Sequence, residues 1–234
     1  MKKMISVLLA MSLTLSLAAC SGTSPKTAQE TSSAQPAAGA SSTVAEVEHL
    51  EGGWERPVSP VVTEEQKTLL ERATQELDGA QYAAVACLGT QVVAGTNHRL
   101  LCTVTPVVPD AVSTYAIVTL YEDLEGNAEL TEVLESTEEA PQEGLAGGWT
   151  APESPELTEE ALTMFQKATE DVEGTSYSPV VLLSTQVVAG TNYRFLCEAH
   201  PGIREGETEY DILTVYEDLE GNVELTEVVS FQTE

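Results

Sequence analysis

Gln91-Val92-Val93-Ala94-Gly95-Thr96-Asn97 recurs unchanged as Gln186-Val187-Val188-Ala189-Gly190-Thr191-Asn192, 95 positions later in a chain of 234 residues. The paired valines favour extended backbone, and the glycine that follows tolerates positive φ. An apolar run resumes after each copy, at residues 100–102 and 195–197. The pattern predicts a β-hairpin with a small, apolar, glycine-bearing tip. Because the tip has no acid, base or nucleophile, it suits binding as a wedge better than catalysis.

The repetition extends well beyond the two tips. Trp54 matches Trp149, and Tyr121–Asn127 matches Tyr216–Asn222, all at the same offset. A period this long, with a complete helix-plus-strands pattern in each copy, indicates tandem domains rather than a solenoid of short repeats. We therefore predict domains at residues 51–134 and 147–234. A connector rich in Glu, Pro and Gly joins them at 135–146.

Each repeat reads as one helix followed by four strands. Thr63-Glu64-Glu65-Gln66 is a capping box, and apolar residues then recur at helical spacing until Gly79. The second repeat keeps this stripe with different apolar residues, which indicates core packing rather than a cofactor site. Strands are predicted at about 80–93, 97–106, 113–122 and 128–134. The expected class is α+β, with one helix wrapped by a 4–5-stranded antiparallel sheet in each repeat.

The residues of the tip also carry a family resemblance. Gln-Val-Val-Ala-Gly resembles the QxVxG hairpin signature of the cystatins, and residues 186–193 resemble the stefin form of it. A Gly-Gly pair lies upstream of each helix, as the family's amino-terminal glycine does. Leu124-Glu125 and Leu219-Glu220 stand where stefins place a second hairpin containing Leu-Pro. The resemblance covers about 85 residues of each repeat and implies two tandem cystatin-like domains.

The resemblance implies a double-headed, reversible and non-covalent inhibitor of papain-like cysteine proteases. In each repeat, the glycine pair, the hairpin and the second tip would together enter the active-site cleft, without a cofactor. The residues expected to contact the protease are Gly52, Gly53, Gln91, Val92, Val93, Ala94, Gly95, Leu124 and Glu125 in the first repeat, and Gly147, Gly148, Gln186, Val187, Val188, Ala189, Gly190, Leu219 and Glu220 in the second.

Two further expectations follow from this hypothesis. A bulky residue at Gly95 or Gly190 should abolish binding with little change in stability, because the glycine backbone would approach the target closely. The second repeat should bind more tightly, because Tyr193 would form an aromatic platform beside its tip where the first repeat has His98.

The alternative is a non-inhibitory cystatin-like surface lipoprotein that binds another protein or ligand. Glu125 and Glu220 support this alternative, since each places a charge where the family has an apolar contact. The residues after the first glycine pair, Trp54-Glu55-Arg56-Pro57, are also unusual for the family.

The amino-terminal segment predicts export. Residues 1–19 combine Lys2-Lys3 with an apolar run too short to span a bilayer, which is typical of a signal peptide. Leu-Ala-Ala-Cys at 17–20 resembles a bacterial lipobox, which implies a lipid on Cys20. The alternative is an ordinary cleaved signal peptide. Residues 20–50 contain almost no large apolar residue and read as a flexible tether. We expect a protein anchored to the outer face of the bacterial cell membrane, with membrane contact only through this lipid.

The formal net charge of −28 makes nucleic-acid binding a poor hypothesis, because such a surface repels phosphate. The acidic stretch 122–127 lacks the alternating ligands and terminal glutamate of an EF-hand loop, so we expect no metal there. The three histidines have no counterparts in the other repeat, and no HExxH, CxxC, P-loop or GxSxG motif occurs. The sequence therefore predicts that the protein is not an enzyme.

The cysteines allow one cross-strand disulfide. If Ala94 and Gly95 are the two central turn residues, Cys87 faces Cys102 across the hairpin. A one-residue shift of the turn would separate the pair. In the same register Cys197 faces Leu182 and should be a free, buried thiol.

Overall fold

The computed structural model describes residues 52–142, 147–202 and 209–233. The predicted signal peptide, Cys20 and the tether lie outside these residues. No helix in the described ranges is long and apolar enough to cross a membrane. The described residues all belong to one compact unit.

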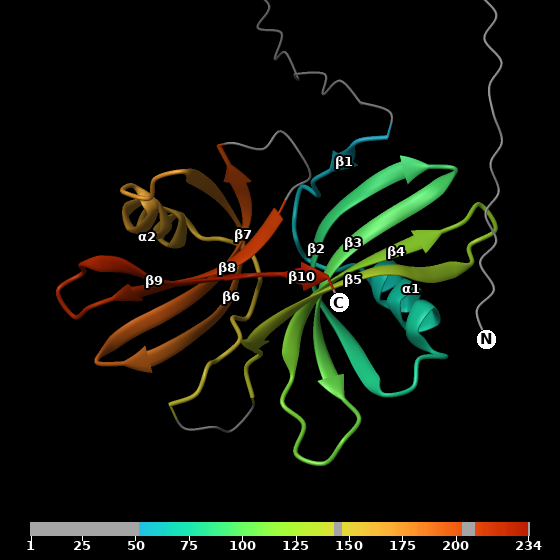
Figure 1. Ribbon diagram of the computed structural model, residues 1–234, viewed down its shortest axis with the longest axis horizontal. Helices are drawn as coiled ribbons and strands as arrows, with labels where there is room; N and C mark the ends of the chain where they lie inside the picture. The colour runs from blue at the N-terminus through green and yellow to red at the C-terminus, as the bar shows by residue number, and fades with distance from the viewer. Residues whose placement is uncertain (1–51, 143–146, 203–208, 234) are drawn as a thin grey trace, which may run out of the picture. The chain divides into compact units, whose positions relative to one another are not determined.

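The first repeat forms one helix and most of one antiparallel sheet (Figure 1). The helix is α1 (Glu64–Thr74). The sheet has the strand order β1-β2-β3-β4-β5-β10, and its last strand comes from the end of the chain. Its strands are β1 (Trp54–Glu55), β2 (Ala80–Val93), β3 (Gly95–Pro106), β4 (Thr114–Glu122), β5 (Ala128–Glu139) and β10 (Gln232–Thr233). β5 runs to Glu139, so part of the range predicted as a connector is strand.

The second repeat forms α2 (Glu159–Thr169) and a four-stranded sheet with the order β6-β7-β8-β9. Its strands are β6 (Thr175–Val188), β7 (Gly190–Pro201), β8 (Glu209–Glu217) and β9 (Val223–Ser230). Thr150 and Thr185 form an isolated bridge at the place where β1 pairs with β2 in the first repeat.

Local sequence explains where both helices begin. The Thr63 hydroxyl accepts from the Gln66 amide, and the Gln66 side chain accepts from the Thr63 amide, so the predicted capping box is confirmed. Thr158 caps α2 by accepting from the Ala161 amide, but the methyl side chain of Ala161 cannot accept a second bond in return. Each cap satisfies an amide that the helix itself leaves unpaired.

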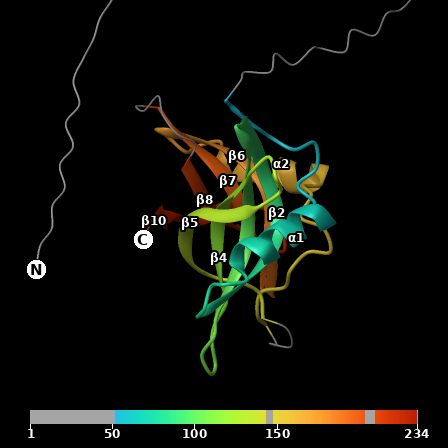
Figure 2. The same cartoon turned by 90° about the vertical axis from the view of Figure 1, so that its right-hand side faces the viewer.

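Each helix packs on one face of its own sheet (Figure 2). Leu69 and Leu70 of α1 contact a cluster that includes Leu100, Val118 and Leu120. In the second repeat Ala161 and Phe165 contact Phe195, Leu213 and Val215. The Phe165 and Phe195 rings meet edge to face, with centroids 5.2 Å apart. These clusters form the outer cores of the protein.

The opposite faces of the two sheets share a third core. It contains Leu101, Tyr115 and Ile117 of the first repeat, and their counterparts Leu196, Tyr210 and Ile212 of the second. Side chains of a strand alternate between faces, so Leu100 lies under the helix while Leu101 meets the other repeat. The order of layers is therefore helix, sheet, sheet, helix.

The predicted fold class, α+β with two tandem cystatin-like domains, is wrong. The described residues are mostly β, with 53% strand and 13% helix. One core is built from both repeats, and β10 from the end of the second repeat pairs with β5 of the first. The physical reason is that both faces of each sheet are apolar. A separate domain would leave Leu101, Tyr115 and Ile117 exposed to water.

Charged groups also join the two repeats. The Arg194 guanidinium pairs with Glu138 and donates to the Glu139 carbonyl oxygen at 2.9 Å. In a second ion pair the arginine comes from the first repeat, where Arg56 pairs with Glu198 of the second. Burial raises the pKa of Glu138, while the charge of Arg194 lowers it. Because Glu138 and Arg194 are both nearly buried, each needs the other as a partner.

The hairpin register differs from the predicted one. Val93 pairs with Gly95, which leaves Ala94 alone at the tip, and two further register shifts follow along β2. Cys87 consequently lies opposite Leu100, and Cys102 lies opposite Ala84. The predicted Cys87–Cys102 disulfide is thus absent, and both thiols are free and buried. Cys197 is free and buried as expected, but it pairs with Pro179 rather than Leu182.

Candidate functional site: two repeated tip edges

Three segments of each repeat meet at one edge of its sheet. In the first repeat, Trp54 pairs with Gln91, and Thr96 at the start of β3 pairs with Glu122 at the end of β4. The glycine pair, the β2–β3 hairpin and the β4–β5 turn are therefore neighbours. We call residues 52–54, 91–97 and 121–127 the first tip edge, and residues 147–149, 186–192 and 216–222 the second tip edge.

A short chain of amide contacts fixes the glycine pair to the hairpin. Asn97 Nδ2 donates to Gln91 Oε1 at 2.8 Å, and Gln91 Nε2 donates to the Gly52 carbonyl oxygen at 2.7 Å. The same chain exists in the second repeat, where Asn192 donates to Gln186 at 3.0 Å and Gln186 donates to Gly147 at 3.0 Å. The repeated glutamine therefore has a specific task, which is to bind the segment that precedes the helix.

The tryptophan that follows each glycine pair is held by an arginine. The Arg99 guanidinium lies 4.0 Å from the Trp54 ring centroid, and Arg194 lies 3.9 Å from that of Trp149. A cation over an indole face is attracted by the negative face of the ring. These contacts and the glutamine contacts fix the segment of the glycine pair from both ends.

The β4–β5 turn is connected to the hairpin through a tyrosine. Tyr121 Oη donates to the Ala94 carbonyl oxygen at 2.5 Å. Gly95 is buried at φ +130°, and a Cβ there would lie 2.4 Å from the Glu122 carbonyl oxygen and 2.8 Å from the Tyr121 ring. Gly95 is therefore required by the fold, since no side chain fits between the tip and β4. Tyr216 and Gly190 repeat this arrangement.

The β4–β5 turn is centred on an aspartate. Asp123 Oδ1 accepts from the amides of Glu125 and Asn127, and Oδ2 accepts from the Asn127 side chain. These bonds favour the carboxylate, and the Asn127 side chain is the largest cause of the lowered pKa of Asp123. Asp218 has the same partners and a lowered pKa in the second repeat.

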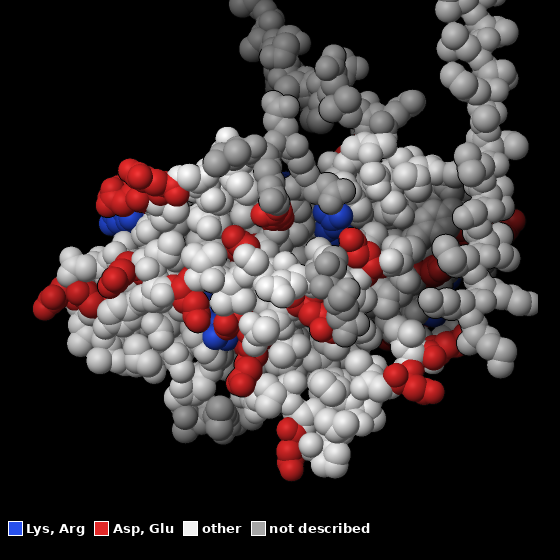
Figure 3. Space-filling view, viewed as in Figure 1, with Lys and Arg blue, Asp and Glu red and all other residues white. Residues whose placement is uncertain are grey.

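The fixed backbone of each edge presents exposed apolar side chains. Val92, Val93 and Leu124 are exposed at 65%, 43% and 87% in the first repeat. Val187, Val188 and Leu219 are exposed at 76%, 48% and 85% in the second. Glu125 and Glu220 lie beside the leucines and are also exposed. On the face seen in Figure 3, acidic side chains clearly outnumber basic ones.

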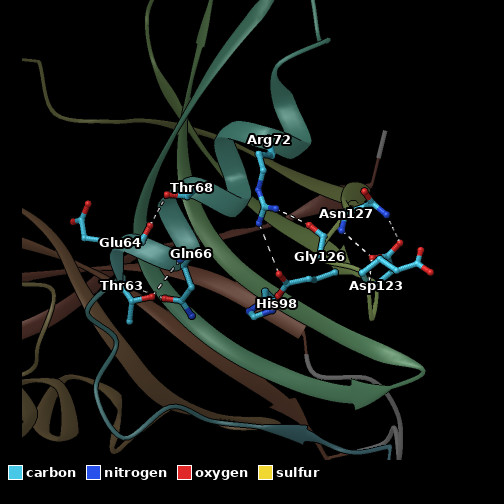
Figure 4. A network of polar contacts seen from close by, with 11 residues as sticks. Thr63, Glu64, Gln66, Thr68, Arg72, His98, Asp123, Gly126 and Asn127 are labelled. Carbon is cyan, nitrogen blue, oxygen red and sulfur yellow. Dashed lines mark hydrogen bonds and ion pairs between the residues drawn. The ribbon is translucent and has the colours of Figure 1, made fainter.

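The two edges differ at their bases, on the side that faces the helix. In the first repeat Arg72 of α1 donates to the Gly126 carbonyl oxygen at 2.5 Å and lies 3.7 Å from Glu122 (Figure 4). His98 Nε2 lies 3.4 Å from Glu122. In the second repeat Tyr193 replaces His98 and donates to Glu217 at 3.2 Å.

The expectation that Tyr193 forms an aromatic platform beside the tip is wrong. Its ring packs in the helix-facing core with Phe165, Phe195 and Leu213. The hydroxyl reaches Glu217, which precedes the turn rather than the exposed valines. The exchange of His98 for Tyr193 therefore changes the support of the turn rather than the exposed tip.

The described residues offer no cluster of three or more His, Cys, Asp or Glu side chains able to hold a metal ion. Burial raises the pKa of the Cys102 thiol to about 12 and raises that of Cys197 well above its usual value. Neither buried thiol is therefore suited to act as a nucleophile at neutral pH.

The structure brings the predicted site residues of each repeat to one edge, with Gly95 and Gly190 buried behind the tips. Sequence reasoning did not assign roles to the tyrosines, asparagines and aspartates that hold each edge together. Their signal was available, because Tyr121, Asn97 and Asp123 all lie in stretches that the second repeat copies exactly in sequence. A scan against models of protein families finds no match, and a search of curated proteins finds none.

Proposed function

We propose that the protein is a reversible, non-covalent inhibitor of papain-like cysteine proteases, and that each tip edge blocks one active-site cleft. The observation that carries this proposal is the convergence of three exposed segments at one edge, repeated with the same internal contacts. A cleft that accepts an extended peptide can accept a rigid edge about as wide as a hairpin. No scissile bond and no cofactor is needed for such a block.

The internal contacts support binding by a preformed surface. The glycine pair is held by Gln91, the hairpin tip by Tyr121 and the turn by Asp123. A surface that is already ordered loses little conformational entropy when it docks, and this favours affinity. The exposed valines and leucine supply the apolar area that the core of an interface requires.

The resemblance of Gln-Val-Val-Ala-Gly to the cystatin signature supports the choice of target class. It does not depend on the predicted fold class, because a wedge needs the tip edge and its support, not a separate domain. The lipid on Cys20 and the outer face of the membrane remain predictions. With them, the inhibitor would act on proteases outside the cell.

The second candidate is a non-inhibitory binding module with a different partner. Glu125 and Glu220 favour this second candidate. Each is an exposed carboxylate in the turn beside the hairpin, and it must lose water when it enters an apolar cleft. The two candidates share the tip edges as the contact surface. They differ in whether an active-site cleft is the partner.

A kinetic assay with charge variants tests the proposal. We would compare residues 21–234 with Val92→Asp/Val187→Asp in assays of papain, and use trypsin as a control protease. Val108→Asp is the matched control, because Val108 is 62% exposed but lies beyond the other end of β3. Inhibition of papain alone, lost in the double variant and kept in the control variant, supports the proposal. Binding to papain without inhibition would favour the second candidate.

A further inference from the structure

A pocket of about 570 Å³ lies between α1 and the strands at the base of the first tip edge. Leu69 forms an apolar wall of the pocket. Its polar walls come from Glu65, Thr68, Arg72, His98 and Glu122. Figure 4 shows the helix residues and His98 on opposite sides of this space. The pocket is separate from the exposed valines of the edge.

His98 is an unusual component of this pocket. Both ring nitrogens are shielded from solvent, and neither has a hydrogen-bond partner. Buried polar atoms without partners are uncommon in proteins because they lose water without compensation. The imidazole therefore has hydrogen-bonding capacity that the chain itself does not use.

The second repeat shows what fits at the corresponding place. Tyr193 stands where the first repeat has His98, and its phenol packs in the helix-facing core. Its hydroxyl donates to Glu217, which is the counterpart of Glu122. The second repeat thus carries a built-in phenol bonded to a carboxylate. In the first repeat the corresponding carboxylate lies 3.4 Å from His98 Nε2 without a hydrogen bond between them, and it also lines the pocket.

We propose that this pocket binds a phenol ring whose hydroxyl donates to Glu122, as the ring of Tyr193 does to Glu217. The Leu69 side chain would contact the ring face, and the His98 ring would border it. Phenol binding does not require the proposed inhibitory function, although Glu122 belongs both to the pocket and to the first tip edge.

The charges around the pocket restrict the ligand further. Glu64, Glu65 and Glu122 line it, and Arg72 is the one cation among its lining residues. Arg72 is already engaged by the Gly126 carbonyl oxygen and by Glu122. A phenol that carries a carboxylate would therefore be repelled, whereas a neutral or cationic phenol would be accepted.

Chemical-shift titration of residues 21–234 tests the site, with p-cresol as the probe. We expect saturable shifts at His98, Glu122 and Arg72 with a Kd in the millimolar range, since so small a ligand makes few contacts. 4-Methylanisole has the same ring but no hydroxyl hydrogen. It should bind about tenfold more weakly or worse, because a bond to a charged acceptor is lost. Tyramine should bind more tightly than 4-hydroxyphenylacetate.

Reciprocal variants complete the test. His98→Tyr should supply a hydroxyl to Glu122 from the chain itself and so remove p-cresol binding, and Tyr193→His should create a second saturable site at Glu217. Each variant introduces a residue that the other repeat already accommodates, and circular dichroism would verify folding. The proposal is overturned if p-cresol causes no saturable shifts near His98. It is also overturned if 4-methylanisole binds equally well, or if His98→Tyr leaves the affinity unchanged.

Discussion

Tyr121 Oη lies 2.5 Å from the carbonyl oxygen of Ala94, and Tyr216 Oη lies 2.5 Å from that of Ala189. In each repeat one tyrosine hydroxyl therefore joins the residue at the hairpin tip to the strand that leads into the β4–β5 turn or its counterpart, the β8–β9 turn. The bond spans two of the three segments of each edge. It gives a direct way to loosen an edge without changing its exposed surface.

Removing this hydroxyl should weaken inhibition more than stability. Tyr121→Phe/Tyr216→Phe retains both rings but frees the tip carbonyls, each of which can then bond to water. A single hydrogen bond contributes about 1 kcal/mol, so we expect roughly fivefold weaker inhibition per edge. Inhibition constants and thermal unfolding would be measured on the same preparations. Unchanged inhibition with a lowered melting temperature would show that the bond serves the fold alone.

Substitution of Gly95 should now be judged as a change to the fold. The expectation from sequence was lost binding with little loss of stability, but Gly95 has φ +130° and its Cβ would contact Glu122 and Tyr121. Gly95→Ala should destabilise the protein by about 1–3 kcal/mol. Gly126→Ala is the matched control, since Gly126 also has positive φ but has nothing within 4 Å of its Cβ. If urea unfolding gives the same loss of unfolding free energy for Gly95→Ala and Gly126→Ala, the close contact at Gly95 does not destabilise the variant.

The shared core predicts that the two repeats unfold together. Ile212 is 1% exposed and packs in the core that includes Leu101 and Tyr115. Ile212→Ala should cost about 2–5 kcal/mol and lower the stability of both repeats. Hydrogen exchange would follow amides of β3 and of β7 in the variant. Faster exchange in β7 with unchanged exchange in β3 would contradict a common core.

Acid should loosen the β4–β5 turn and its counterpart between β8 and β9. Hydrogen bonds from Asn127 lower the pKa of Asp123 below its usual value of 3.8 in the folded protein. The contribution of the carboxylate is therefore complete above that usual value, and it is lost as the pH falls through the lower folded value. Amide shifts of Glu125 and Asn127 should report this transition. Asp123→Asn should show the loosened turn at neutral pH, and an unchanged turn in that variant would contradict the role of the charge.

The sequence predicted local features better than the packing of the repeats. The capping box at Thr63 and the hairpin at Ala94 follow from neighbouring residues, whose chemistry decides both. The register failed because a single residue at the tip and two bulges shift the pairing, and each shift depends on contacts across the sheet. The predicted disulfide depended on that register and failed with it.

The shared core has a signal in the sequence of its strands. Leu100-Leu101-Cys102 and Ala116-Ile117-Val118 are apolar at successive positions, as strands buried on both faces are. A sheet with one helix needs only alternate apolar residues. The second apolar face of each strand therefore required a partner, and the other repeat supplies it. Which surface would provide that partner could not be read from the strands alone.

Titration of a fixed amount of papain with residues 21–234 tests the proposed function most directly. Residual activity should fall linearly to an end point of two papain molecules per chain. Val92→Asp should reduce the end point to one, and Val92→Asp/Val187→Asp should remove the inhibition. Full papain activity at micromolar concentrations of the folded protein would contradict the claim that the two tip edges block papain-like clefts.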